Sequence, residues 1–158
     1  MASSAMRWCA PGCAALALKL AACRPPPPPP LAAGQTWMVA SHRGDGATST
    51  TILAIEPVTP LGPVAFVTVN NMILTMPDKT RRNKLGPTAF TLSALQASVT
   101  DYQFRQGADV RYAGYVERWR EQAAQGRAAE FTYGVPIASA LDQFERGQIQ
   151  PTTLGTLR

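Results

Sequence analysis

The chain has 158 residues, a formal net charge of +5 at neutral pH and an apolar fraction of 46%. This length and composition are typical of one ordinary globular domain. The positive charge is small and scattered, so by itself it does not indicate nucleic-acid binding. All three cysteines lie within the first 23 residues, which excludes a disulfide framework in the rest of the chain.

The first 22 residues have the layout of a secretory signal peptide. One arginine supplies a positive charge, residues 13–18 form a short apolar core, and Ala21 and Ala22 are small enough to enter a peptidase cleft. The segment Leu20-Ala21-Ala22-Cys23 resembles the lipobox of bacterial lipoproteins. The resemblance implies that residues 20–22 are recognised during processing, that the chain is cut before Cys23, and that the Cys23 sulfur carries a diacylglyceryl group.

Other interpretations of this leader stay open. Lys19 interrupts the apolar run, and Met6 is a second candidate start. A buried alanine-rich helix or a chance match would account for the same residues. A transmembrane span is disfavoured because it needs roughly 20 apolar residues, and this run is shorter. In a cell with two membranes, Arg24 after the cysteine resembles the pattern of lipoproteins that pass to the outer membrane.

A proline run follows the candidate lipidation site. Residues 25–30 are all proline, and proline fixes φ and lacks an amide donor, so this run cannot join a helix or a sheet. We expect a stiff polyproline helix of roughly 19 Å, at about 3.1 Å per residue. Residues 23–34 are therefore interpreted as a lipid-bearing tether, and residues 35–158 as the single globular domain that the tether holds away from the membrane.

From residue 35 onward the pattern favours strands. β-branched and aromatic residues dominate, and Gly, Pro and Asx interrupt them about every eight to twelve positions. Strands are predicted at residues 37–39, 50–56, 64–69, 88–92 and 97–104, with a turn at 42–46 and a proline-bounded connection at 57–63. Residues 64–69 are apolar on both faces, which predicts a central strand. The predicted fold class is mainly β: a small antiparallel sheet, sandwich or barrel-like domain with one or two short helices, and α+β as the alternative.

The pattern is ambiguous at two places. Asn70 and Asn71 form either a tight turn before residues 72–76 or part of one long strand, because asparagine tolerates positive φ better than most residues. Residues 110–119 fit both strand and helix periodicity. Gly114 and its neighbouring tyrosines favour a strand first, with a helix following over residues 117–125.

The carboxyl-terminal third contains two clearer signals. Residues 129–135 are a short strand candidate. Residues 137–146 have apolar side chains at helical spacing, and Gly147 directly after them is a typical helix stop. This pattern predicts a short amphipathic helix over residues 137–146.

Residues 77–87 are predicted to form a polar loop with four cations, Lys79, Arg81, Arg82 and Lys84. Such a cluster is a candidate site for an anionic ligand such as a lipid phosphate or an acidic polysaccharide. A solvated loop is the alternative interpretation. A nucleic-acid partner is disfavoured, because single-strand binding uses stacking aromatic side chains and none occurs between Lys79 and Lys84.

Motifs for catalysis are weak. His42 is the only histidine, it falls in a predicted turn, and no GxSxG elbow accompanies it. The chain has no Walker loop, dinucleotide fingerprint, HExxH or EF-hand loop, so we expect no cofactor, no metal and no catalytic residues. Seven aromatic residues would line an apolar pocket if the sheet closes into a barrel, or would fill a core without a ligand: Tyr102, Phe104, Tyr112, Tyr115, Trp119, Phe131 and Tyr133.

These observations favour an envelope lipoprotein, anchored to the membrane through acylated Cys23, that acts as a non-catalytic structural or binding module. Its expected partners are the membrane and an envelope polymer or protein. Two alternatives from other classes remain. One is an envelope hydrolase acting on wall or lipid material, which predicts a cleft where His42 or paired acids converge. The other is a soluble protein that binds acidic polymers through the basic loop.

Overall fold

The computed structural model describes residues 27–40, 47–107 and 110–149. The candidate lipidation site Cys23, the signal residues Leu20, Ala21 and Ala22, and the histidine at position 42 lie outside the described residues. Within the described ranges, no helix is long and apolar enough to span a membrane.

Six strands form one sheet in the order β5-β1-β2-β3-β4-β6. All neighbouring strands are antiparallel except the parallel pair β4 and β6. Strands make up 43% of the structure and helices 28%, which confirms the prediction of a mainly β fold. The bounds are β1 Gln35–Val39, β2 Ser49–Val58, β3 Gly62–Thr75, β4 Arg81–Thr91, β5 Val99–Arg105 and β6 Thr132–Tyr133.

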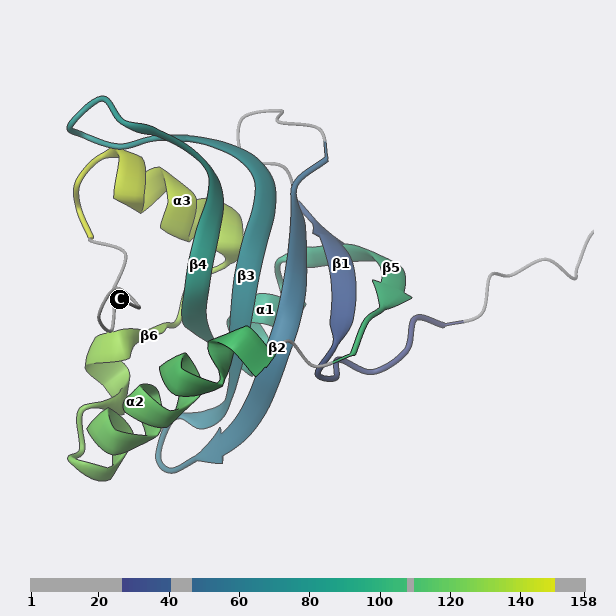
Figure 1. Cartoon of the computed structure of the whole chain (residues 1–158), viewed down its shortest axis with the longest axis vertical. Helices are drawn as coiled ribbons and strands as arrows, with labels where there is room; N and C mark the ends of the chain where they lie inside the picture. The colour runs from purple at the N-terminus through teal and green to yellow at the C-terminus, as the bar shows by residue number, and fades with distance from the viewer. Residues whose placement is uncertain (1–26, 41–46, 108–109, 150–158) are drawn as a thin grey trace, which may run out of the picture.

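Helices cover both faces of this sheet (Figure 1). The short helix α1 (Leu92–Gln96) and the helix α3 (Ile137–Glu145) pack on one face, and α2 (Ala113–Ala124) packs on the other. Two short 3-10 turns, η1 (Val110–Tyr112) and η2 (Ala128–Phe131), flank α2. The predicted helix at residues 137–146 is confirmed, and Gly147 ends it at a φ of 66°.

The predicted strand at the start of residues 110–119 is wrong. The segment forms η1 and then α2, because helical spacing places Tyr115, Val116 and Trp119 together on one buried face. Trp119 packs edge-on against Phe66 of β3, with ring centroids 5.0 Å apart. Burial of these large side chains outweighs the strand preference of the local sequence. The candidate strand at 129–135 is likewise reduced to the two residues of β6, which follow η2.

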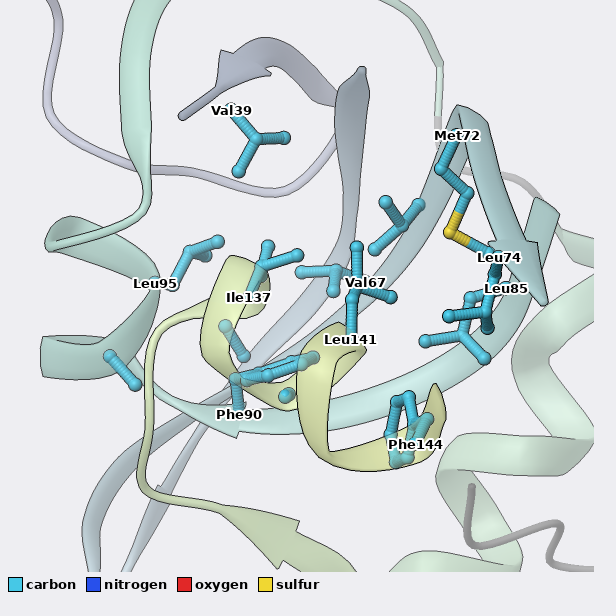
Figure 2. Close-up of a cluster of buried hydrophobic side chains, with 14 of the residues drawn as sticks. Val39, Val67, Met72, Leu74, Leu85, Phe90, Leu95, Ile137, Leu141 and Phe144 are labelled. Carbon is cyan, nitrogen blue, oxygen red and sulfur yellow. The ribbon is translucent and has the colours of Figure 1, made fainter. Parts of the chain in front are cut away.

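The face under α1 and α3 is mainly apolar, with the buried hydroxyls of Thr50 and Thr88 among its apolar side chains, and we call it the closed face. The helix α3 contributes buried residues to this face at the i, i+3, i+4 and i+7 spacing of an amphipathic helix. Figure 2 shows these side chains converging from the strands and from α3. The buried members are Trp37, Val39, Ile52, Ala65, Val67, Val69, Met72, Leu74, Met76, Leu85, Phe90, Ala94, Leu95, Ile137, Ala140, Leu141 and Phe144.

The strand β3 contributes residues to this core both before and after one shift in its pairing register. Val67 and Val69 face α3 at odd positions, whereas Met72 and Leu74 face it at even positions. A register shift between Asn70 and Leu74 makes this change of parity, and Asn71 lies in it with a φ of 57°. The asparagine pair is therefore part of one long strand, because a residue that tolerates positive φ lets the strand bulge without ending.

The opposite face carries a smaller apolar cluster under α2. Val64, Phe66 and Ala89 from the sheet meet Tyr115, Val116 and Trp119 from the helix, and Ala128 completes the buried set. Arg120 of α2 donates to Glu56 of β2 across 2.6 Å, which adds a polar link at the margin. Burial, the largest cause, raises the pKa of the Tyr115 phenol above its ordinary value. This cluster covers only the part of the face that lies beneath α2.

The described end of the tether is attached to the sheet through Gln35, which is only 5% exposed. Its side-chain amide donates to the carbonyl of Pro30 at 3.0 Å. Its side-chain oxygen accepts from the backbone of Ala32 and from the indole nitrogen of Trp37, both at 2.9 Å. These bonds join Pro30, the last proline of the run, to the first strand.

Candidate functional site

Beyond α2, the second face of the sheet is polar and open; we call this region the polar cleft. Thr36, Thr51 and Thr68 are register partners on the neighbouring strands β1, β2 and β3. On the other side of β1, Thr36 is paired with Phe104 of β5. Register partners point to the same face of a sheet, so three hydroxyls and one aromatic ring lie in a row across four strands.

A second polar row runs beside the first. Ser49 of β2 is paired with Asn70 of β3, and Asn70 is paired with Lys84 of β4. Ser49 lies two residues before Thr51, and Asn70 two residues after Thr68. Positions two apart along a strand share a face, so the two rows form one polar floor.

The cleft above this floor has a volume of about 290 Å³. The strands β1, β2 and β3 form its floor. Its rim is formed by Lys84 of β4 together with Phe104, Gln106, Gly107, Arg111 and Tyr112. Thr36 and Thr68 are 6% and 3% exposed, whereas Lys84 and Arg111 are exposed. The described lining is Gly34, Thr36, Ser49, Thr51, Ile52, Leu53, Thr68, Asn70, Asn71, Lys84, Phe104, Gln106, Gly107, Arg111 and Tyr112.

Two cations and a phenol meet at the rim. The ammonium nitrogen of Lys84 donates to the hydroxyl of Tyr112 at 3.0 Å and lies 5.7 Å from the centroid of its ring. The guanidinium of Arg111 lies 5.9 Å from the same centroid. Tyr112 is also the N-cap of α2, so the amino-terminal end of that helix, which carries partial positive charge, is at this rim.

The described part of the lining contains no acidic side chain. Positive charge at the rim is therefore combined with hydroxyl and amide groups on the floor. The hydroxyls of Thr36 and Thr51 hydrogen-bond each other at 3.0 Å, and each keeps capacity for a further bond because a hydroxyl has one donor and two acceptor positions. The arrangement can bind an anion at the rim and orient polar groups of the same ligand on the floor.

The four cations that the sequence places in one loop are divided between a turn, which holds Lys79, and the strand β4, which holds the other three. Residues 77–80 form a hairpin turn, while Arg81, Arg82 and Lys84 belong to β4. Pro87 does not interrupt this strand because it lies at a register shift between Val67 and Val69 of the partner strand, where a bulge tolerates proline.

Only Lys84 reaches the polar cleft. Arg81 and Arg82 line a separate surface hollow of about 420 Å³ beside Met72, Ile73 and Asn83. Lys79 occupies the turn with a φ of 69°. The adjacent Asp78 accepts from the backbone and hydroxyl of Thr80, chiefly the hydroxyl, and these bonds lower its pKa below the ordinary value.

The seven aromatic residues do not form one pocket. Tyr115, Trp119 and Phe131 pack in the cluster under α2, and Tyr133 packs against the closed-face core. Tyr102 stacks edge-on against Trp37 with centroids 5.3 Å apart. Phe104 and Tyr112 alone among the seven line the polar cleft.

Sequence reasoning missed Arg111 and the threonine row as site residues. Arg111 is 27 positions from Lys84, and its neighbour Tyr112 was assigned to a strand rather than to the start of a helix. The threonines are single residues in three different strands, so no local motif marks them. Alternation within each strand is the only available signal, and it does not indicate which strands are neighbours.

The described residues hold no group of three or more His, Cys, Asp or Glu side chains that could bind a metal ion. Comparisons of the chain with protein-family models, curated proteins and solved structures found no match.

Proposed function

We propose that this chain is a lipid-anchored binding module of the cell envelope, in which the polar cleft holds a small anionic ligand without catalysing a reaction on it. The observation that carries the binding role is the pairing of Lys84 and Arg111 at the rim with a floor of hydroxyl and amide side chains. Ligand sites of this type use a few placed polar groups to fix orientation.

The electrostatic case rests on Lys84. Its hydrogen-bond partner is the neutral hydroxyl of Tyr112, and no described carboxylate forms an ion pair with it. The ammonium charge is therefore available to an incoming anion. Arg111 lines the same rim, and the attraction between opposite charges is stronger in a recessed site than in open water.

The anchor is supported by the lipobox-like segment ending at Cys23 and by the tether that follows it. The tether meets the domain at Pro30, which Gln35 holds, and Gly34 beside it lines the polar cleft. The cleft thus lies at the end of the domain that the tether joins. A lipid at Cys23 would keep this cleft within a few tens of ångströms of the membrane, given about 3.1 Å per residue of polyproline.

The hydrolase alternative is not supported by a specific contact. It predicts His42 or paired acids converging in a cleft. His42 lies outside the described residues, and the described lining of the cleft contains no carboxylate. The basic-loop alternative loses its premise, because the four cations are divided between a turn, a separate hollow and the cleft.

The anchor is tested by expressing the full chain and the Cys23→Ser variant in a bacterium and labelling with radioactive palmitate. We expect the unaltered chain to carry label and sediment with membranes, and the variant to do neither. Cys13→Ser is the matched control, since it removes a thiol but leaves the lipobox intact, and it should still be labelled. Equal membrane partition of the Cys23→Ser chain and the unaltered chain would contradict the anchor.

The binding role is tested on the unlipidated Cys23→Ser chain by NMR titration with inorganic phosphate and with glucuronate. We expect amide shifts to move at Thr51, Thr68 and Lys84 as either anion is added. In a Lys84→Met background these shifts should weaken, whereas Arg81→Met, which removes a cation from the separate hollow, should leave them unchanged. Shifts confined to residues 79–82 would place the anion site in the hairpin instead and refute the proposal.

A further inference from the structure

We infer that the ligand of the polar cleft is an acidic sugar, meaning a sugar ring that carries a carboxylate or a phosphate. This inference rests on the proposed binding function and adds the ligand class. In this arrangement the acidic group lies at Lys84 and Arg111, the ring hydroxyls lie on the threonine row, and an apolar face of the ring packs on Phe104.

The length of the threonine row argues against a bare inorganic anion. Neighbouring strands are about 4.8 Å apart, so Thr36 and Thr68, two strands apart, are separated by roughly 10 Å. A phosphate ion held by the rim cations cannot reach across this distance. One small ring does not span the whole row either, and the volume of about 290 Å³ limits the ligand to such a ring with its substituents, so the ligand contacts part of the floor together with the rim.

The side chains of the floor can both donate and accept hydrogen bonds. They therefore match ligand hydroxyl groups better than ligand groups that only donate or only accept. Thr36, Thr51, Thr68 and Ser49 carry hydroxyls, which both donate and accept, and Asn70 carries an amide with both functions. Sugar hydroxyls have the same dual character. A polyhydroxylated ring can therefore bond the floor groups that it reaches, whereas a carboxylate ion offers only acceptors and a phosphate ion at neutral pH has at most two hydroxyl donors.

Phe104 supplies the apolar part of the site. Its side chain is 46% exposed, although phenylalanine is ordinarily buried, and it lies at the end of the threonine row opposite to Lys84. An exposed aromatic ring next to hydroxyl donors matches the two kinds of surface on a sugar, whose C–H groups form apolar patches between the hydroxyls. Tyr112 places a second ring at the rim, held by its bond to Lys84.

The test is calorimetric titration of the unlipidated Cys23→Ser chain with four probes: glucuronate, glucose 6-phosphate, glucose and inorganic phosphate. We expect the two acidic sugars to bind at least about tenfold more tightly than glucose, because a charge-assisted hydrogen bond at Lys84 is lost with the neutral sugar. They should also bind more tightly than phosphate, which cannot use the floor or Phe104.

Two variants separate the parts of the site. Phe104→Ala should weaken binding of glucuronate about three- to tenfold, as expected for loss of an aromatic contact, and leave phosphate binding unchanged. Lys84→Met should weaken both. The matched control for the aromatic is Tyr102→Ala, which removes a comparably exposed ring from the same strand but on the side that contacts Trp37, and it should leave all four affinities unchanged.

The outcomes distinguish this inference from the proposed function. If phosphate binds as tightly as the acidic sugars, the sugar assignment is overturned and the anion-binding role stands. If no anion binds, both are overturned. If Phe104→Ala reduces phosphate binding as much as glucuronate binding, the aromatic ring maintains the shape of the site and does not contact a sugar. The assignment of an acidic sugar then also fails.

Discussion

The two faces of the sheet are built from the same strands but are covered differently. The closed face is mainly apolar from β1 to β4 and is covered by α1 and α3 (Figure 2). The other face is apolar only beneath α2 and is polar and open beyond it. Strand β3 shows the contrast within one segment, since Val67 and Val69 enter the closed face while Thr68 between them forms the floor of the cleft.

This difference indicates which side chains stabilise the fold and which remain available to a ligand. On the closed face, side chains are held by contacts on all sides, so truncation leaves a cavity. On the open half of the other face, Ser49, Thr51 and Asn70 are partly exposed at the cleft, whereas Thr36 and Thr68 are nearly buried beneath it. The same substitution made on each face should therefore have very different effects on stability. Two pairs of variants compare the faces directly, and two further pairs test the backbone and the rim of the cleft.

The largest effect is expected from the phenylalanine pair. Phe144 is fully buried and packs edge-on against Tyr133 with centroids 5.4 Å apart, so Phe144→Ala should lower the free energy of unfolding by about 3–5 kcal/mol. Phe104→Ala in the cleft should change it by less than about 0.5 kcal/mol. Chemical denaturation of both variants measures the difference. Equal losses would show that the cleft side of the sheet is packed as tightly as the closed face.

The next effect concerns the backbone beneath the cleft. Gly34 has a φ of 82°, and a Cβ at this position would lie 2.3 Å from the carbonyl oxygen of Gln106. Gly34→Ala should therefore cost more than about 2 kcal/mol, because it combines a left-handed conformation with a backbone clash. Gly86→Ala is the control, since a Cβ there meets no atom within 4 Å. A stable Gly34→Ala protein with intact anion binding would show that the cleft backbone can relax.

A serine pair compares hydroxyl groups on the two faces. Ser98 is 2% exposed, donates to the carbonyl of Ala94 at 2.7 Å and accepts from the backbone nitrogen of Ile137 at 2.8 Å, which fixes the start of α3. Ser98→Ala should cost about 1–3 kcal/mol, because it leaves a buried amide unpaired. Ser49→Ala in the cleft should cost less than about 0.5 kcal/mol. Thermal unfolding of both proteins provides the comparison, and a larger loss at Ser49 would reverse the roles assigned to the two hydroxyls.

The smallest effect on stability is expected at the rim. Lys84→Met keeps the aliphatic stem of an exposed side chain, so the free energy of unfolding should change by less than about 0.5 kcal/mol. Anion affinity should nevertheless fall, whereas Arg81→Met should change neither property. Parallel denaturation and titration measurements check the separation. A Lys84→Met protein that is strongly destabilised would indicate a structural rather than a ligand-binding role.

Several elements were predictable because their signals are local. The helix at residues 137–146 follows from apolar spacing and a terminal glycine, and the central position of residues 64–69 follows from apolar side chains on both faces. The basic segment was misassigned because Pro77 and Pro87 resemble loop boundaries. A proline within a strand is tolerated only at a bulge, and that bulge depends on the partner strand.

The helix α2 was misassigned at its start for a related reason. Gly114 and the surrounding tyrosines have a local preference that favours a strand, but burial of Tyr115 and Trp119 against Phe66 favours the helix. The site itself was beyond local prediction. Lys84, Arg111 and the three threonines come from β4, η1 and three separate strands, and no spacing along the chain connects them.

The sequence alone determined the mainly β character of the domain, its central strand, its last helix and the lipobox-like leader that predicts an anchor. These properties follow from side-chain periodicity and from motifs of a few neighbouring residues. The tertiary structure decided which strands are neighbours, and thereby which hydroxyls share a row and which cations share a rim. The physical reason is that cross-strand register depends on hydrogen bonds between distant segments, whereas periodicity depends on backbone geometry over a few residues.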